Sequence, residues 1–279
     1  MKKIILASLI TAANISSFAA PAANPQKTAA TNSVINNSPA IDPAFAKVQT
    51  LIQANNFTAA YQELERLAKS GNAQALYNLA YLNQVGKGTP QNNAKAAKYY
   101  EQAGEKGYSI ANYVLAQNYA TGGLGLKKDD KKSRQYLEKA SAQGFNDATV
   151  ELAVLLFAEG TAQSDKLALQ KLDPLLKQGN YQALHAKALY DISQGIVQKN
   201  TKLVEQGLNN IKDLGVKGYI PALMAIGNMF VNGNITEQNL PEAKKIYTAL
   251  AEQNVPQAKE SLELVNKLIA EQSKAAVKK

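Results

Sequence analysis

The chain has no cysteine among its 279 residues and a single histidine, His185. Without a thiol it forms no disulfide and offers no residue for lipoprotein acylation. A cysteine nucleophile paired with histidine, and most zinc sites, need side chains that the chain does not supply. The composition therefore predicts no catalytic residues, no metal and no cofactor, and it predicts stability that comes from packing alone.

Long apolar runs are also scarce. The run near the start follows Lys2 and Lys3, is interrupted by Asn14, and ends in small residues up to Ala19. This pattern is typical of a secretory signal peptide and is too broken for a membrane helix. We therefore expect a signal peptide over residues 1–19, no transmembrane segment, and export to the periplasm or beyond. Residues 20–41, rich in alanine, asparagine, serine, threonine and proline, are expected to form a flexible linker.

The net charge is +9, of which Lys2 and Lys3 contribute two. The remaining basic residues are interspersed with acidic ones, as in 127–132, and no arginine-rich helix or nucleic-acid motif is present. We therefore expect a solvated surface and no nucleic-acid partner. Attraction to an anionic polymer of the cell envelope stays open.

Glycine followed four residues later by alanine recurs along the chain. The pairs are Gly71/Ala75, Gly107/Ala111, Gly144/Ala148, Gly179/Ala183 and Gly218/Ala222, and successive glycines lie 36, 37, 35 and 39 residues apart. We call these the closing glycines and the register alanines, and each glycine separates two helical patterns. Helix–turn–helix repeats of this period are typical of an α-solenoid. The sequence predicts an all-α fold of about five to six helical pairs.

Each repeat is expected to hold a first helix, which follows a closing glycine, and a second helix, which ends before the next one. Asn254 takes the closing position of the last repeat. Fifteen residues before the closing position, a side chain that favours the helix N-cap is found in five of six repeats. These predicted caps are Asn56, Asn92, Asp129, Ser164 and Asn239. Leu203 is the exception, and there we expect the cap at Asn200 or Thr201.

The second helices share a pattern of side-chain size. The residue eleven before the closing position is small: Ala60, Ala96, Ser133, Ala168, Gly207 and Ala243. Four residues later comes a larger apolar one: Leu64, Tyr100, Leu137, Leu172, Ile211 and Tyr247. Residues four apart share a helix face, so small side chains permit close approach of two helices beside a larger buried partner.

The turn containing Gly86 and Gly88 and the run from Ala96 to Gly107 resemble the Sel-one-like repeat family. The resemblance covers residues 57 to about 254, whereas the tetratricopeptide repeat has 34 residues and a final proline that is missing here. It implies a right-handed superhelix whose first helices line a concave groove, and an adaptor role for protein or peptide partners. Exported bacterial members resemble envelope-assembly, signalling or host-interaction proteins. Cysteine-rich secreted members are associated with β-lactams, but this chain lacks their cysteines and any Ser-x-x-Lys motif.

The repeat domain is expected over residues 42–272, from an N-cap at Asp42 to a capping helix from Pro256 to about Gln272. Residues 273–279 are expected to form a basic, frayed tail. The fourth repeat is degenerate, because Lys187 takes a leucine position and a longer linker is expected between Gly195 and Lys199.

The candidate groove residues lie two and six positions after the register alanines. They are Tyr77, Tyr81, Tyr113, Gln117, Val150, Val154, His185, Leu189, Met224 and Asn228. Tyrosine, methionine and amide side chains suit a surface that holds an extended peptide. The alternative is that the tyrosines pack between adjacent repeats and that His185 is a partly buried helix residue.

Two functions compete at this point. The first is a non-enzymatic exported scaffold that binds a protein or peptide in the groove, with peptidoglycan or a host protein also possible. The second is an envelope enzyme or enzyme modulator acting on peptidoglycan or β-lactams, for which the basic charge is the only direct hint.

Overall fold

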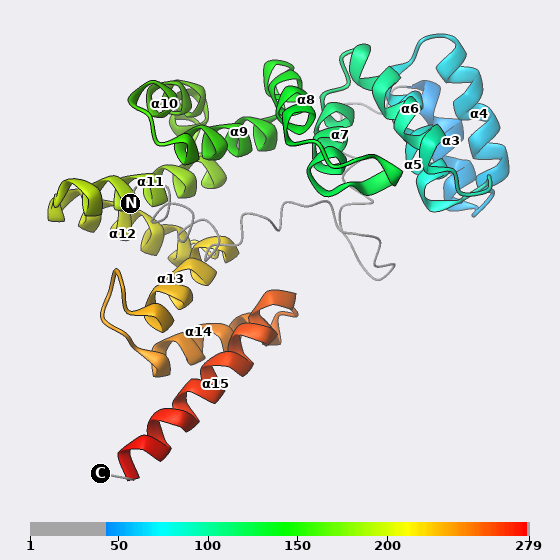
Figure 1. Cartoon of the computed structure of the whole chain (residues 1–279). Helices are drawn as coiled ribbons and strands as arrows, with labels where there is room; N and C mark the ends of the chain where they lie inside the picture. Colours follow the sequence, from blue (N-terminus) through cyan, green and yellow to red (C-terminus); the bar gives the residue numbers. More distant parts are fainter. Residues whose placement is uncertain (1–42, 278–279) are drawn as a thin grey trace. The chain divides into compact units, whose positions relative to one another are not determined.

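The computed structural model describes residues 43–277, and over that range the chain is helical without any strand (Figure 1). Contacts divide it into two compact units, one ending at Leu152 and the other beginning at Ala153. We call the described residues 43–152 the N-terminal unit and 153–277 the C-terminal unit. The predicted signal peptide, the linker and the cap at Asp42 lie outside the described residues. None of the described helices is both long and apolar enough to cross a membrane.

The N-terminal unit contains α3 (Pro43–Gln53), α4 (Phe57–Lys69), α5 (Ala73–Val85), α6 (Asn93–Glu105), α7 (Ser109–Thr121), the short 3-10 helix η2 (Gly123–Gly125) and α8 (Asp130–Ala142). Helix α9 (Asn146–Glu159) contains the boundary between the units. The C-terminal unit continues with α10 (Ala162–Lys177), α11 (Tyr181–Gln198), α12 (Thr201–Val216), α13 (Ile220–Asn232), α14 (Leu240–Glu252) and α15 (Pro256–Val277). The predicted alternation of first and second helices is confirmed.

The turns between repeats require left-handed backbone. Gly107 has φ 89°, and a Cβ added there would meet no neighbouring atom within 4 Å, so the requirement for glycine is conformational. Asn254, which takes the closing position of the last repeat, has φ 60°. Asparagine is among the few other residues that adopt this conformation readily, which explains why it can replace glycine there.

Four predicted N-caps are confirmed, because the side chains of Asn56, Asn92, Asp129 and Asn239 each accept a hydrogen bond from the backbone three residues on. Asn200 caps α12 in the same way, as the alternative prediction proposed. The prediction for Ser164 is wrong, because Thr161 is the N-cap of α10 and Ser164 forms the capping box with it. Helices α10 and α12 have 16 residues where α6 and α8 have 13, so both begin about one turn earlier.

The size pattern of the second helices is confirmed by burial. The six larger apolar residues are at most 1% exposed. Among the small ones, the four alanines are fully buried and Ser133 is 8% exposed. At Gly207 an added Cβ would lie 2.7 Å from Ile192 Cγ1 and 2.8 Å from the Ala188 carbonyl oxygen, so α11 and α12 approach too closely there for any side chain.

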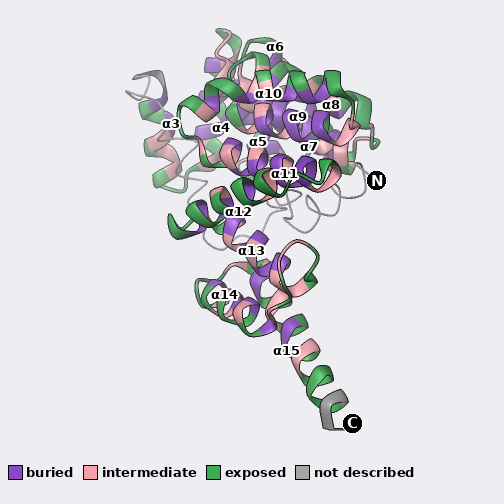
Figure 2. Ribbon diagram, turned by 90° about the vertical axis from the view of Figure 1, so that its left-hand side faces the viewer, coloured by how far each residue is buried: buried purple, intermediate pink, exposed green. Residues whose placement is uncertain are grey.

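Each unit has its own apolar core. In the N-terminal unit, separate clusters form around Leu64, Tyr100 and Leu137. In the C-terminal unit, one cluster surrounds Ile211 and another Tyr247. Figure 2 shows that buried residues alternate with exposed ones along the helices, so each helix contributes one face to these clusters.

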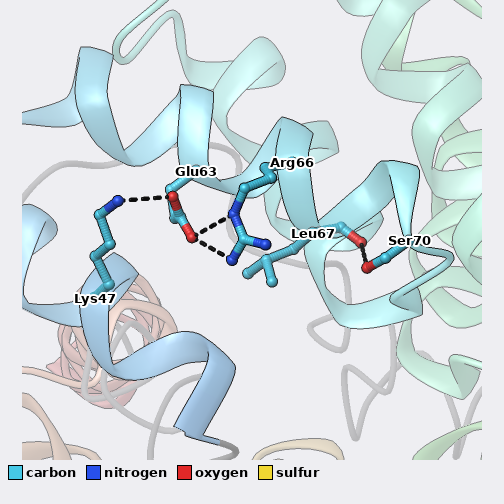
Figure 3. A network of polar contacts seen from close by, with 5 residues as sticks. All are labelled: Lys47, Glu63, Arg66, Leu67 and Ser70. Atoms are coloured by element: carbon cyan, nitrogen blue, oxygen red, sulfur yellow. Dashed lines mark hydrogen bonds and ion pairs between the residues drawn. The ribbon is translucent and has the colours of Figure 1, made fainter.

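A polar network joins helices α3 and α4 (Figure 3). Glu63 on α4 accepts hydrogen bonds from Arg66 one turn later, with Nη2 at 2.6 Å, and from Lys47 Nζ on α3 at 3.0 Å. The hydrogen bond from Arg66, followed by that from Lys47, lowers the pKa of the Glu63 carboxyl. These contacts orient α3 against α4 at the edge of the apolar cluster.

Two local features differ from the sequence predictions, and a third explains how a charged residue fits a leucine position. The segment from Gly195 to Gln198 is the last turn of α11 and not a linker. Helix α15 extends to Val277, beyond the predicted end at Gln272. Lys187, in a leucine position, is half-buried and binds both carboxylate oxygens of Asp191 one turn later, at 2.9 and 2.7 Å, which accommodates its charge.

Replacing Asn92 with alanine should lower the free energy of unfolding by about 1 kcal/mol, because the Lys95 backbone N–H loses its capping acceptor at 2.9 Å. The matched control is Asn93→Ala, one residue later, where the side chain is exposed. It should change the free energy of unfolding by less than about 0.5 kcal/mol. Denaturant unfolding followed by circular dichroism compares the two variants, and equal effects would contradict the cap assignment.

Candidate functional site

Three of the candidate residues two positions after the register alanines form a repeated ring contact. Each lies against the aromatic residue that follows the next closing glycine. The pairs, with their ring-centroid distances, are Tyr77–Tyr108 at 5.1 Å, Tyr113–Phe145 at 4.9 Å and His185–Tyr219 at 5.6 Å. Ring pairs in this range are favourable beyond the area they bury. These side chains therefore link the first helix of one repeat to the start of the next.

The burial of this row agrees with the packing contact. Tyr77, Tyr113 and His185 are 7%, 9% and 4% exposed, and Val150 and Met224 are buried as well. Packing between repeats, the alternative considered from the sequence, accounts for most of the surface of these side chains. Their part in binding a partner stays a prediction.

The residues six positions after the register alanines differ more from one another in their exposure. Tyr81 is 38% exposed, whereas Gln117, Val154 and Leu189 are buried. Asn228 is half-buried and its side-chain oxygen accepts a hydrogen bond from the Tyr247 hydroxyl at 2.6 Å. Tyr81 is thus the most accessible of the candidate groove residues.

A cluster of tyrosines lies near Tyr81. The Tyr77 ring meets the Tyr100 ring edge-on at 5.4 Å, and the Tyr100 hydroxyl donates to Gln84 Oε1 at 2.9 Å. Burial raises the pKa of Tyr77 to about 12, with smaller contributions from Tyr108 and Tyr81. The phenols are therefore neutral at physiological pH, and the rings are held in fixed positions.

Helices α7 and α9, the first helices of two consecutive repeats, share a polar cluster that the sequence analysis did not identify. Gln117 Nε2 on α7 donates to Glu151 Oε2 on α9 at 2.7 Å, and the Tyr113 hydroxyl also hydrogen-bonds Glu151. Burial raises the pKa of Glu151, although both hydrogen bonds oppose that shift. The available signal was a charged residue between Val150 and Leu152, in the middle of a helix whose other charged residues, Asp147 and Glu159, lie near its ends.

The chemistry open to these groups is hydrogen bonding and apolar contact. His185 is neutral at physiological pH, because burial lowers its pKa to about 4. Within residues 43–277, no three side chains of the His, Cys, Asp and Glu types are arranged to hold a metal ion.

Acidification should destabilise the protein through His185. Its ordinary pKa of 6.5 falls to about 4 in the fold, so the unfolded chain binds the proton more readily. This site lowers stability as the pH falls from 6.5 towards 4, by about 2–3 kcal/mol at pH 4.5.

His185→Phe keeps a ring against Tyr219 and removes the titration. The difference in unfolding free energy between the variant and the natural protein should change by about 2–3 kcal/mol between pH 7 and pH 4.5. Denaturant unfolding at a series of pH values measures it. A difference that does not vary with pH would show that His185 is not held neutral by burial.

Comparison with known proteins adds an independent observation. The family model described as Sel1 repeat matches residues 73–108, 109–145 and 220–255. These ranges correspond to the helical pairs α5–α6, α7–α8 and α13–α14. The two repeats with longer second helices, those of α10 and α12, fall outside the matched ranges.

Two solved structures are similar in fold. A Sel1 repeat protein from Oxalobacter formigenes superimposes with a TM-score of 0.60 at 21% identity, covering 78% of this chain and 86% of that one. A protective antigen present in uropathogenic Escherichia coli strains, described as displaying an SLR fold, gives a TM-score of 0.55 at 20% identity over 75% of this chain. This chain covers 44% of that antigen, which is less than half of its length. No curated protein sequence matches. Three helical pairs of this chain thus match the Sel1 repeat, and the two solved structures share its fold.

Proposed function

We propose that this protein is a non-enzymatic, exported scaffold that binds a protein or peptide partner through the exposed part of its first helices. Sel1 repeats typically mediate interactions between proteins, which supports the scaffold role. The proposed setting is the bacterial envelope or contact with a host, and the proposed location is the periplasm or the extracellular space.

The observation that carries the proposal is Tyr81. Its side chain is 38% exposed on α5, next to a tyrosine cluster that is otherwise buried. A tyrosine loses little conformational entropy on binding and combines apolar area with a hydroxyl group, so it is common at the centre of binding sites. Neighbours that are fixed by packing make such an anchor preorganised.

The half-buried Glu151 carboxylate on α9 supplies a hydrogen-bond acceptor of the proposed surface. Gln117 and Tyr113 hold the Glu151 carboxylate from two sides. An extended peptide presents backbone N–H groups that need acceptors when they leave water. A carboxylate held in fixed orientation provides an acceptor of this kind.

The proposal of export rests on the sequence of residues 1–19. The basic head with Lys2 and Lys3, the short apolar run and the small residues up to Ala19 follow the arrangement of a secretory signal. The absence of cysteine means that arrival in an oxidising compartment requires no disulfide formation.

Tyr81→Ala should reduce capture of the partner from an envelope extract of the source cell by about tenfold or more, as is typical of an aromatic anchor. Purified natural protein and variant serve as baits at equal concentration, and quantitative mass spectrometry measures the captured proteins. The matched control is Leu167→Ala on α10, where a residue of similar exposure, 42%, is removed outside the proposed surface.

Capture that is retained by Tyr81→Ala, or lost equally in Leu167→Ala, would contradict the proposed surface. Circular dichroism confirms that each bait is folded.

Export is tested separately. The natural chain is expressed from Met1 in a bacterial host, and its intact mass is measured in the periplasmic fraction. A chain that begins at Ala20 is expected, and an uncleaved cytoplasmic chain would contradict export.

A further inference from the structure

The C-terminal unit exposes a group of large apolar residues around one turn between repeats. Val216 at the end of α12 is 90% exposed, and Ile220 at the start of α13 is 38% exposed. Tyr181 at the start of α11 is 42% exposed. Its ring lies 5.9 Å from the Tyr219 ring and 5.9 Å from Lys217 Nζ. We call Tyr181, Val216, Lys217, Tyr219 and Ile220 the turn patch.

The repeat architecture does not require apolar residues at these positions. Two residues before the closing position, where Val216 lies, the other repeats have Lys69, Glu105, Ala142, Lys177 and Glu252. Two residues after it, where Tyr181 and Ile220 lie, they have Ala73, Ser109, Asn146 and Pro256. Small, polar or charged residues and one proline therefore occupy these positions elsewhere in the same chain, so the repeat register does not require large apolar side chains there.

The turn patch is held by the fold before any partner binds. The Tyr219 ring packs on buried His185, and the Tyr219 backbone N–H donates to the Leu214 carbonyl oxygen at 3.0 Å. Gly218 turns the chain between Val216 and Ile220 with φ 78°. A partner that covers these side chains would not have to order them first, which lowers the entropic cost of binding.

The charge at the turn patch indicates the chemistry of the partner. Among residues 43–277, no carboxylate forms an ion pair with Lys217, whose ammonium group lies over the Tyr181 ring. One positive and one negative residue, Lys212 and Asp213, are exposed next to each other on α12, the helix that ends just before Lys217. An incoming carboxylate would gain a cation at Lys217 while an adjacent apolar side chain covers Val216 and Ile220.

We propose that the turn patch is a second docking surface, which binds a peptide segment of a partner protein with apolar side chains next to a carboxylate. The apolar side chains cover Val216 and Ile220, and the carboxylate pairs with Lys217. This surface is distinct from the one around Tyr81, so the two are tested by different variants.

The test uses the full chain with 13C-labelled valine and isoleucine methyl groups and three blocked synthetic peptides. The first has a leucine–phenylalanine core flanked by glutamates, the second has lysines in place of the glutamates, and the third has serines in place of the core. The glutamate peptide with the apolar core should shift the Val216 and Ile220 methyl resonances in a saturable manner. The other two peptides should bind at least about fivefold more weakly.

Val216→Glu should weaken binding of the first peptide by about fivefold or more, because it removes the apolar contact and repels the glutamates, and it should fold normally because Glu105 and Glu252 occupy the same position in other repeats. The matched control is Leu264→Glu on α15, which replaces another exposed residue, 53% exposed, outside the turn patch and should leave binding unchanged. Absence of a saturable shift at Val216 and Ile220 would overturn the proposal. Equal binding of the three peptides, or equal weakening by both variants, would also overturn it.

Discussion

The close approach of the two helices in each repeat depends on one small side chain in the second helix. Gly207 shows the constraint most directly, because even a Cβ there would lie 2.8 Å from the Ala188 carbonyl oxygen. Alanine at the same position in other repeats, such as Ala96, is fully buried. The larger residue four positions later, such as Tyr100, then fills the core beside the contact. Where the second helix has 13 residues, as in α6 and α8, its N-cap lies four residues before the small residue.

The same packing limits the surface that is available for function. Stacking of consecutive repeats uses Tyr77, Tyr113 and His185, each of which contacts the aromatic residue after the next closing glycine. Side chains that stay exposed because stacking does not bury them are therefore the candidates for binding a partner. Tyr81 and the turn patch are exposed although equivalent positions elsewhere are buried, small or charged. A solenoid can acquire binding sites in this way without changing the contacts that hold its repeats together.

The fold followed from the sequence because the helical period and the size of buried side chains recur in every repeat. The register correctly predicted Leu172 and Ile211 as buried even where the helices are longer. It failed at Ser164, because an extra turn of α10 moves the cap to Thr161 while the buried face is kept. The candidate site was less predictable. The exposure of a side chain depends on neighbours distant in sequence, so Tyr77 and Tyr81 appeared equally suited to bind a partner. The hydrogen-bond partners of Glu151 lie on α7, so the sequence of α9 does not reveal them.

The central claim is that helix approach depends on a small residue at the buried position of each second helix. Unfolding of Ala96→Leu and Ala94→Leu by denaturant, followed by circular dichroism, tests it most directly. The two variants make the same substitution on α6, with Ala96 fully buried and Ala94 exposed. The account predicts that Ala96→Leu lowers the free energy of unfolding by about 1–3 kcal/mol and that Ala94→Leu changes it by less than about 0.5 kcal/mol. Equal stability of the two variants would contradict it.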